Sequence, residues 1–169
     1  ATGKTEIGLE VARQIQKSEI LSVDSRQLYR HMDIGTAKVS ASQRAEIPYH
    51  FIDIIEPDTA YSAGAYARAA RQGITEIWQR DGTPLLVGGT GLYWQAVLDG
   101  FFADEGDYQP IRDKINERYN RYGLIPLYEE LGRLDPIVQG RLNPNDKQRI
   151  IRGLEVAMGG GEPLSHRWL

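Results

Sequence analysis

Three short apolar segments, each ending in a polar or glycine-rich turn, constrain the fold of this chain most strongly. They cover residues 19–24, 49–55 and 85–87. Helical patterns, in which apolar residues recur every three or four positions, lie around them at 5–16, 62–80 and 92–98. Strands that alternate with helices are typical of a parallel sheet covered by helices. We therefore predict an α/β fold.

Near its start the chain has Gly3, Lys4 and Thr5, which match the end of the phosphate-binding loop pattern G-x-x-x-x-G-K-[ST]. The first glycine of that pattern would precede residue 1. A helix follows directly, and the N–H groups of its first turn would point at the glycine turn, where an anion can bind. A lysine in a first helical turn is also often a solvated side chain. The motif alone leaves both interpretations open.

Two more polar turns follow predicted strands. Asp24 and Ser25 end the first strand, and Thr90 lies in Gly88-Gly89-Thr90-Gly91 after the third. In open parallel sheets, ligands bind beyond the carboxyl ends of the strands. We therefore place Asp24 and Thr90 at a candidate ligand site. The structural alternatives are an aspartate that caps a turn and glycines that serve the backbone only.

The segment 26–42 between the first two strands is irregular, polar and cationic, with Arg26, Arg30, Lys38 and Tyr29. Cations beside an aromatic ring suit contact with phosphate or a nucleotide. A solvated loop has the same composition and is slightly favoured by it.

The pattern changes after Gly100, where an acidic linker at 101–109 precedes purely helical patterns at 111–122, 127–131, 136–141 and 145–158. We predict a core at 1–103 and a mainly helical segment at 104–169. Arg149 and Arg152 share one face of the last helix. Two fixed guanidiniums can grip phosphate, and pairing with Asp146 and Glu155 fits the helical spacing equally well.

Composition narrows the functional classes. A net charge of −3 means that contact with nucleic acid would need a local basic patch. The chain has no cysteine, which excludes disulfides and thiolate metal sites, and its three histidines are scattered. No run approaches the roughly 20 apolar residues of a membrane helix, and the start does not read as a signal peptide. We expect a cytoplasmic protein that does not enter membranes.

Taken together, the motifs closely resemble those of the tRNA dimethylallyltransferases, also called tRNA isopentenyltransferases. The matching blocks follow the family's order and spacing and cover nearly the whole chain. They are T-G-K-T at 2–5, S-V-D-S-R-Q-L-Y-R at 22–30, M-D-I-G-T-A-K at 32–38, P-Y-H-F-I-D-I at 48–54, Y-S-A at 61–63, L-L-V-G-G-T-G-L-Y at 85–93 and N-P-N-D-K-Q-R-I-I-R-G-L-E-V at 143–156.

The resemblance implies a P-loop nucleotide-kinase-like parallel sheet with helices on both faces, plus a helical insertion. It implies transfer of a dimethylallyl group from dimethylallyl diphosphate to N6 of the adenosine 3′-adjacent to the anticodon, position 37, in tRNAs that read U-starting codons. It also implies a strand before residue 1 in the middle of the sheet, whose loss would leave a gap between neighbouring strands, and more core after residue 169. We expect residues 1–169 alone to fold poorly and to lack transferase activity.

Roles for individual residues also come from the resemblance. Asp24 matches the general base, and Thr90 matches a residue that holds the reaction centre. The diphosphate would be bound by Thr2, Gly3, Lys4, Thr5, Arg149 and Arg152, with the Thr5 hydroxyl on Mg²⁺. The tRNA would be contacted by Asp24, Ser25, Arg26, Gln27, Arg112, Gln148, Arg149, Ile150, Ile151 and Arg152. The expected protein is a monomer.

Three alternatives remain open. An adenylate isopentenyltransferase would prenylate free AMP, ADP or ATP, whereas the helical insertion with Arg112, Arg149 and Arg152 favours tRNA. A P-loop kinase or NTPase would need an acidic Mg²⁺ ligand after a buried strand, and Asp53 is the only fair candidate. A non-enzymatic RNA-binding module fits least, because the net charge is negative and Asp24 ends a strand where a catalytic group would lie.

Overall fold

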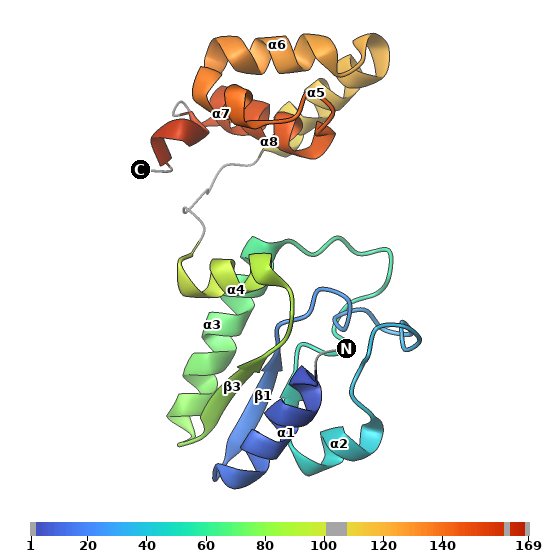
Figure 1. Ribbon diagram of the computed structural model, residues 1–169, viewed down its shortest axis with the longest axis vertical. Helices are drawn as coiled ribbons and strands as arrows, with labels where there is room; N and C mark the ends of the chain where they lie inside the picture. The colour runs from blue at the N-terminus through green and yellow to red at the C-terminus, as the bar shows by residue number, and fades with distance from the viewer. Residues whose placement is uncertain (1–2, 101–107, 161–162, 168–169) are drawn as a thin grey trace. The chain divides into compact units, whose positions relative to one another are not determined.

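A computed structural model describes residues 3–100, 108–160 and 163–167 of the chain. The chain divides into two compact units, residues 1–101 and 102–169 (Figure 1). The predicted boundary between 103 and 104 and the acidic part of the predicted linker lie outside the described residues.

The first unit is built on a parallel sheet of three described strands. They are β1 (Ser18–Ser22), β2 (Tyr49–His50) and β3 (Thr83–Val87), in the order β2-β1-β3. Ile20 of β1 pairs with Tyr49 on one side and with Leu85 on the other. Short apolar strands that pair in parallel need crossover helices between them, as the alternating sequence pattern predicted.

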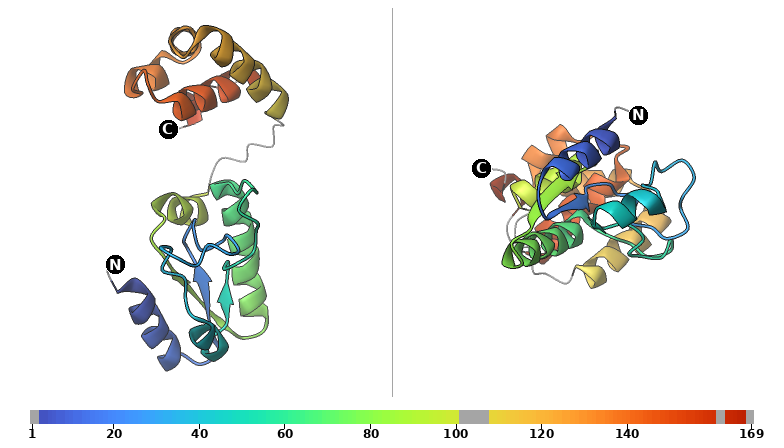
Figure 2. Two further views of the ribbon diagram at one scale, coloured as in Figure 1. Left: turned by 90° about the vertical axis from the view of Figure 1, so that its right-hand side faces the viewer. Right: turned by 90° about the horizontal axis from the view of Figure 1, so that it is seen from below.

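Helices cover both faces of this sheet (Figure 2). Helix α1 (Lys4–Gln14) packs on β1 and β3, and its Gly8 lies directly against Val87. Helix α3 (Ala63–Gln79) packs on the other face, where Tyr66 and Leu21 are fully buried, and helix α4 (Gly91–Leu98) packs against α3. The predicted α/β class with helices on both faces is confirmed.

Two predictions for the segment between β1 and α3 are wrong. The strand expected at 49–55 ends after His50, because Phe51 and Asp53 have φ of 62° and 56°, in the left-handed region that interrupts a strand. The irregular stretch expected to run to residue 42 gives way to helix α2 (Ala41–Glu46). Ser40 and Gln43 form a capping box there, which satisfies N–H groups at the start of this short helix.

The three described strands are contiguous, and the gap expected from the missing upstream strand stays a prediction. β1 pairs with β3 directly, from Ser18 opposite Thr83 to Ser22 opposite Val87. Because β1 and β3 are direct neighbours, the segments that follow them begin side by side at the same edge of the sheet.

The second unit is helical, as predicted. It contains α5 (Gln109–Tyr122), α6 (Ile125–Leu134), α7 (Pro136–Arg141), α8 (Lys147–Gly159) and the 3₁₀ turn η1 (Leu164–Arg167). The carboxylate of Asp146 accepts a hydrogen bond from the Arg149 N–H and caps α8. The core consists of buried apolar side chains from α5 to α8: Ile115, Leu127, Leu131, Val138, Ile150, Ile151 and Leu154. Across the described parts of both units, no helix has the length and apolarity to span a membrane.

Candidate functional site

The first turn of α1 lies beside the turn between β3 and α4. Gly3 precedes the helix with φ of 70°, a left-handed conformation that glycine adopts without strain. A Cβ atom on Gly89 would stand 3.4 Å from Lys4 Cε and 3.7 Å from Lys4 Nζ. The Lys4 side chain therefore lies against the β3–α4 turn. Thr5 is half-buried in the same helical turn, and Thr2 lies outside the described residues.

The segment after β1 is fastened to the same β3–α4 turn. The Val23 N–H donates to Val87 O at 2.8 Å, and the Thr90 N–H donates to Val23 O at 3.0 Å. The two backbones approach so closely that a Cβ atom on Gly88 would stand 2.1 Å from Val23 O. Only glycine fits at this position, so the glycine-rich turn brings the ends of β1 and β3 together.

Asp24, Ser25 and Thr90 meet at this junction. The Ser25 N–H donates to Thr90 Oγ1 at 2.9 Å, and the Thr90 hydroxyl donates to Ser25 Oγ at 3.3 Å. Asp24 is half-buried, and its Oδ1 accepts a hydrogen bond from the Arg26 N–H at 2.9 Å. The junction thus presents a carboxylate and two hydroxyls, with the ammonium of Lys4 beside the same turn. Such a set can bind an anion and accept a proton.

Gln27 lies behind this junction and points inward. Its side chain is buried, its Oε1 accepts a hydrogen bond from the Ser22 hydroxyl at 2.9 Å, and its Nε2 donates to Ala37 O at 3.0 Å. The structure gives this side chain an internal role, and its predicted contact with tRNA stays a prediction. Arg26, by contrast, is exposed.

Tyr66, which lies in the helical pattern at 62–80, also supports the junction. The Tyr66 hydroxyl donates to Ser22 O at 2.9 Å, and its ring stacks on Tyr93 with centroids 4.3 Å apart. Burial raises the pKa of Tyr66, so the hydroxyl stays protonated as a donor. The helical pattern gave no sign of this hydrogen bond.

Cationic side chains in and near the segment 26–42 form ion pairs with carboxylates of the same unit. Lys38 is almost fully buried, and its Nζ donates to Asp33 and Asp53 at 2.7 Å and to Tyr29 O at 2.9 Å. Arg44 donates to the second oxygen of Asp53 at 2.7 Å. Burial acts to raise the pKa of Asp53, but the hydrogen bonds from Lys38 and Arg44 hold it below its ordinary value.

The position of Asp53 weakens the kinase alternative. Both carboxylate oxygens are engaged by cations, and the residue lies in a turn rather than at the end of a buried strand. Across residues 3–100, 108–160 and 163–167, no group of three His, Cys, Asp or Glu side chains could hold a metal ion by itself.

In the second unit, the predicted phosphate-binding and tRNA-binding residues lie on α5 and α8. Arg149 is 74% exposed with Nε 3.4 Å from Asp146, and Arg152 donates to Glu155 at 3.3 Å, so the carboxylate partners suggested by the helical spacing are both present. Gln148 is exposed. Ile150 and Ile151 are buried in the hydrophobic core, so the structure gives their side chains a packing role.

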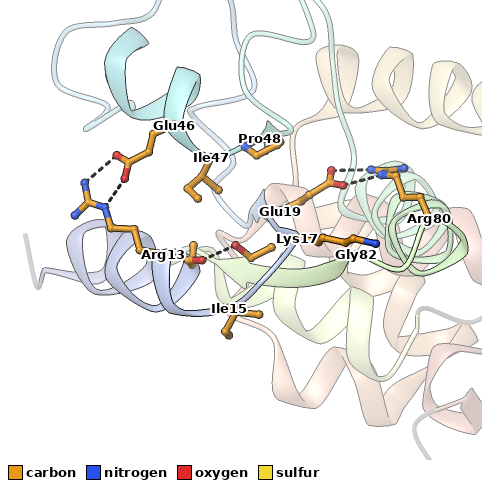
Figure 3. Close-up of a pocket in the computed structure, with 11 residues that line it drawn as sticks. Arg13, Ile15, Lys17, Glu19, Glu46, Ile47, Pro48, Arg80 and Gly82 are labelled. Carbon is orange, nitrogen blue, oxygen red and sulfur yellow. Dashed lines mark hydrogen bonds and ion pairs between the residues drawn. The ribbon is translucent and has the colours of Figure 1, made fainter.

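A pocket of about 400 Å³ opens at the opposite end of the sheet (Figure 3). It is lined by residues at the starts of β1 and β3 and at the end of α1. Its charged groups are paired with each other, since Arg13 donates to both oxygens of Glu46, and Arg80 to both oxygens of Glu19. Ligands of open parallel sheets bind at the carboxyl ends of strands, so we place the candidate site at Asp24 and Thr90 instead.

Comparison with known proteins places the chain in one family. The model of a family described as IPP transferase matches residues 27–168. A tRNA dimethylallyltransferase of Desulfotalea psychrophila is 44% identical over 165 residues, which is 98% of this chain and 52% of the relative. One from Leptothrix cholodnii is 49% identical over 174 residues, again 98% and 52%.

Solved structures agree. A tRNA isopentenylpyrophosphate transferase of Bacillus halodurans superimposes with a TM-score of 0.60 at 38% identity, over 96% of this chain and 54% of that one. A eukaryotic dimethylallyltransferase acting on tRNA gives a TM-score of 0.81 at 25% identity, over 98% and 41%. The chain spans about half the length of the curated relatives it matches. The match of the family model over most of the chain and these identities show that the chain belongs to the IPP transferase family.

Proposed function

We propose that the protein transfers a dimethylallyl group from dimethylallyl diphosphate to N6 of adenosine 37, 3′-adjacent to the anticodon, in tRNAs that read U-starting codons. The observation that carries the proposal is the junction of Asp24, Ser25 and Thr90, fastened by the Ser25–Thr90 hydrogen bond with Lys4 beside the same turn. Membership of the IPP transferase family supports it, because the relatives are named tRNA dimethylallyltransferases.

Thr2, Gly3, Lys4 and Thr5 would bind the diphosphate of the donor. The N–H groups at the start of α1 and the Lys4 ammonium supply positive electrostatic potential where the anion would lie. The Thr5 hydroxyl fits Mg²⁺ by its chemistry, since Mg²⁺ takes oxygen ligands and is often held by few protein groups together with phosphates and water. When bound, Mg²⁺ would neutralise part of the diphosphate charge. Arg149 and Arg152 are further candidates for this anion.

Asp24 would act as general base. The N6 nitrogen forms a bond to the dimethylallyl carbon as the bond from that carbon to the diphosphate oxygen breaks, and the N6 proton passes to the Asp24 carboxylate. The adenine amine is a weak nucleophile, so removal of its proton in the transition state favours the reaction. Thr90 would keep the Asp24–Ser25 segment in place, and Lys4 would stabilise the charge on the departing diphosphate.

The tRNA would be bound by residues of both units, through Ser25, Arg26 and Gln27 and through Arg112 and the stretch 148–152. The target base must leave its stack to reach a carboxylate at the edge of a sheet, as in other enzymes that act on a base. We propose that the protein works in the cytoplasm as a monomer.

The test is incubation of the full-length protein with radiolabelled dimethylallyl diphosphate and Mg²⁺ together with tRNA, with AMP, or with ATP alone. Label on adenosine 37 of tRNA, and none on AMP, is the expected result. Label on AMP alone would instead assign an adenylate isopentenyltransferase. Phosphate release from ATP without prenyl transfer would assign an NTPase.

A further inference from the structure

Glu155 is a buried carboxylate in the helical unit. It lies on α8 with its side chain 1% exposed. Arg112 of α5 donates to both of its oxygens, through Nε to Oε1 and through Nη2 to Oε2 at 2.9 Å. Arg152, one turn earlier on α8, donates to Oε2 at 3.3 Å. One carboxylate therefore holds two arginines that come from different helices.

Both arginines remain accessible while Glu155 does not. The Arg112 and Arg152 side chains are 46% and 42% exposed. The Arg152 guanidinium also lies 5.0 Å from the centre of the Tyr108 ring, a cation–π distance that restrains it further. A guanidinium has five N–H donors in a fixed fork, and Arg112 uses two of them on Glu155. The remaining donors of Arg112 are therefore held in a fixed orientation.

A buried carboxylate adds little net stability to a helical unit, because its desolvation offsets most of the ion-pair attraction. An apolar residue of similar size would pack here at lower cost. Unlike an apolar residue, Glu155 can orient the guanidinium groups of the two arginines. It holds the planar forks of two arginines at neighbouring places on the surface formed by α5 and α8.

We propose that Glu155 is a positioning residue, which fixes Arg112 and Arg152 as a pair of phosphate-binding groups for the RNA backbone. This rests on the proposed function, which assigns both arginines to contact with tRNA. A fixed fork recognises phosphate through two parallel hydrogen bonds, so its orientation contributes to binding as well as its charge.

The same unit contains a matched control pair. Arg118 of α5 donates through both terminal nitrogens to the two oxygens of Glu130 on α6. This pair also joins two helices and is partly exposed, but we assign no contact with RNA to Arg118. Glu155→Gln and Glu130→Gln each remove one negative charge and break one bidentate pair between helices.

The decisive experiment measures the affinity of the full-length protein and of both variants for tRNA over a series of salt concentrations. If Arg112 and Arg152 acted only as charges, Glu155→Gln would tighten binding, since removing an anion favours a polyanion. If Glu155 positions the two arginines, Glu155→Gln should instead weaken tRNA binding. We expect Glu155→Gln to weaken binding about tenfold, because ordering the two forks then opposes binding, and Glu130→Gln to stay within about twofold.

Equal or tighter binding by Glu155→Gln than by the wild type would overturn the positioning role while leaving the proposed function intact. Failure of the wild type to bind tRNA would overturn both. If Glu155→Gln does not fold, by circular dichroism and thermal unfolding, Arg112→Lys against Arg118→Lys replaces it. Both keep the charge and remove the fork, and a loss of affinity at Arg112 no larger than that at Arg118 would equally overturn the role.

Discussion

Thr90 accepts a hydrogen bond from the Ser25 N–H at 2.9 Å, although 65 residues separate them in the chain. Ser25 follows β1 and Thr90 follows β3, and these strands pair in parallel with no strand between them. The hydrogen bond therefore fixes the segment that carries Asp24 relative to the turn beside Lys4. In the proposed reaction, Asp24 takes a proton and Lys4 binds the leaving diphosphate.

Replacement of Thr90 tests this hydrogen bond. Thr90→Val keeps the shape but leaves the Ser25 N–H without its acceptor, at a cost of about 1–3 kcal/mol. We expect its turnover in prenyl transfer to fall roughly tenfold or more, while Thr90→Ser, which keeps the hydroxyl, retains most of it. Turnover at saturating donor and tRNA is the measurement. Equal losses in the two variants would show that the hydroxyl has no such role.

Gly88 and Gly91 make a matched pair for the junction of β1 and β3. A Cβ atom on Gly88 would stand 2.1 Å from Val23 O, whereas a Cβ atom on Gly91 meets no heavy atom within 4 Å. We expect Gly88→Ala to lower the free energy of unfolding by about 3 kcal/mol, and Gly91→Ala to change it by less than about 0.5 kcal/mol. Denaturant unfolding curves of the two variants measure this. Similar stability of the two would mean that the backbones are not in close contact.

Glu19 is expected to make the protein sensitive to acid. The hydrogen bond from Arg80, opposed by burial and helped by His50, lowers the pKa of Glu19 from 4.5 to about 2. A lowered pKa in the folded state means that the ionised form adds stability above pH 4.5, and that this stability is lost as the pH falls toward 2.

The variant Glu19→Gln isolates this contribution. We expect wild type to exceed it in free energy of unfolding by about 2 kcal/mol near neutral pH, with the difference shrinking between about pH 5 and pH 2. Glu10→Gln, at a well-exposed side chain, serves as the control for the loss of a surface carboxylate. A difference between wild type and Glu19→Gln that did not change with pH would contradict the assignment.

We expect the ion pairs of Lys38 to stabilise the folded conformation of the segment 29–38. Its ammonium is the shared partner of Asp33, Asp53 and the Tyr29 carbonyl, with its side chain only 3% exposed. Lys38→Met would remove the ammonium from the Tyr29 carbonyl and the partly buried Asp53, which would keep only Arg44 as a partner, and we expect a loss of about 3 kcal/mol in the free energy of unfolding. Lys114→Met, at an exposed position on α5, is the control. A loss no larger than that of the control would mean that the pairs add no net stability.

The sequence predicted the parts of the fold that depend on local patterns. The turn Gly3-Lys4-Thr5, the strand that leads to Asp24 and the glycine turn at Thr90 could all be placed, because periodicity and glycine content are local properties. The apolar segment at 49–55 predicted a strand that is too long, since Phe51 and Asp53 adopt left-handed backbone conformations in a turn held by contacts with distant residues. The capping box at Ser40 and Gln43 is a local sequence signal for the start of α2.

What could not be predicted depends on pairs far apart in the chain. Composition presented Lys38 as a solvated or phosphate-binding cation, whereas it is buried against Asp53. The spacing of Arg152 and Glu155 suggested their pairing, but gave no hint that Arg112 shares the same carboxylate from 43 residues away. Buried ion pairs of this kind leave no periodic trace in a sequence.

The most direct test of the account concerns Asp24. Asp24→Asn keeps the size of the side chain and an oxygen that can accept from the Arg26 N–H, but it cannot take the proton from N6. We expect single-turnover prenyl transfer by the full-length variant to fall by about 10²–10⁴-fold, while its dissociation constant for tRNA stays within about threefold of wild type. Equal losses in rate and in affinity, or an unchanged rate, would contradict the assignment of Asp24 as the general base.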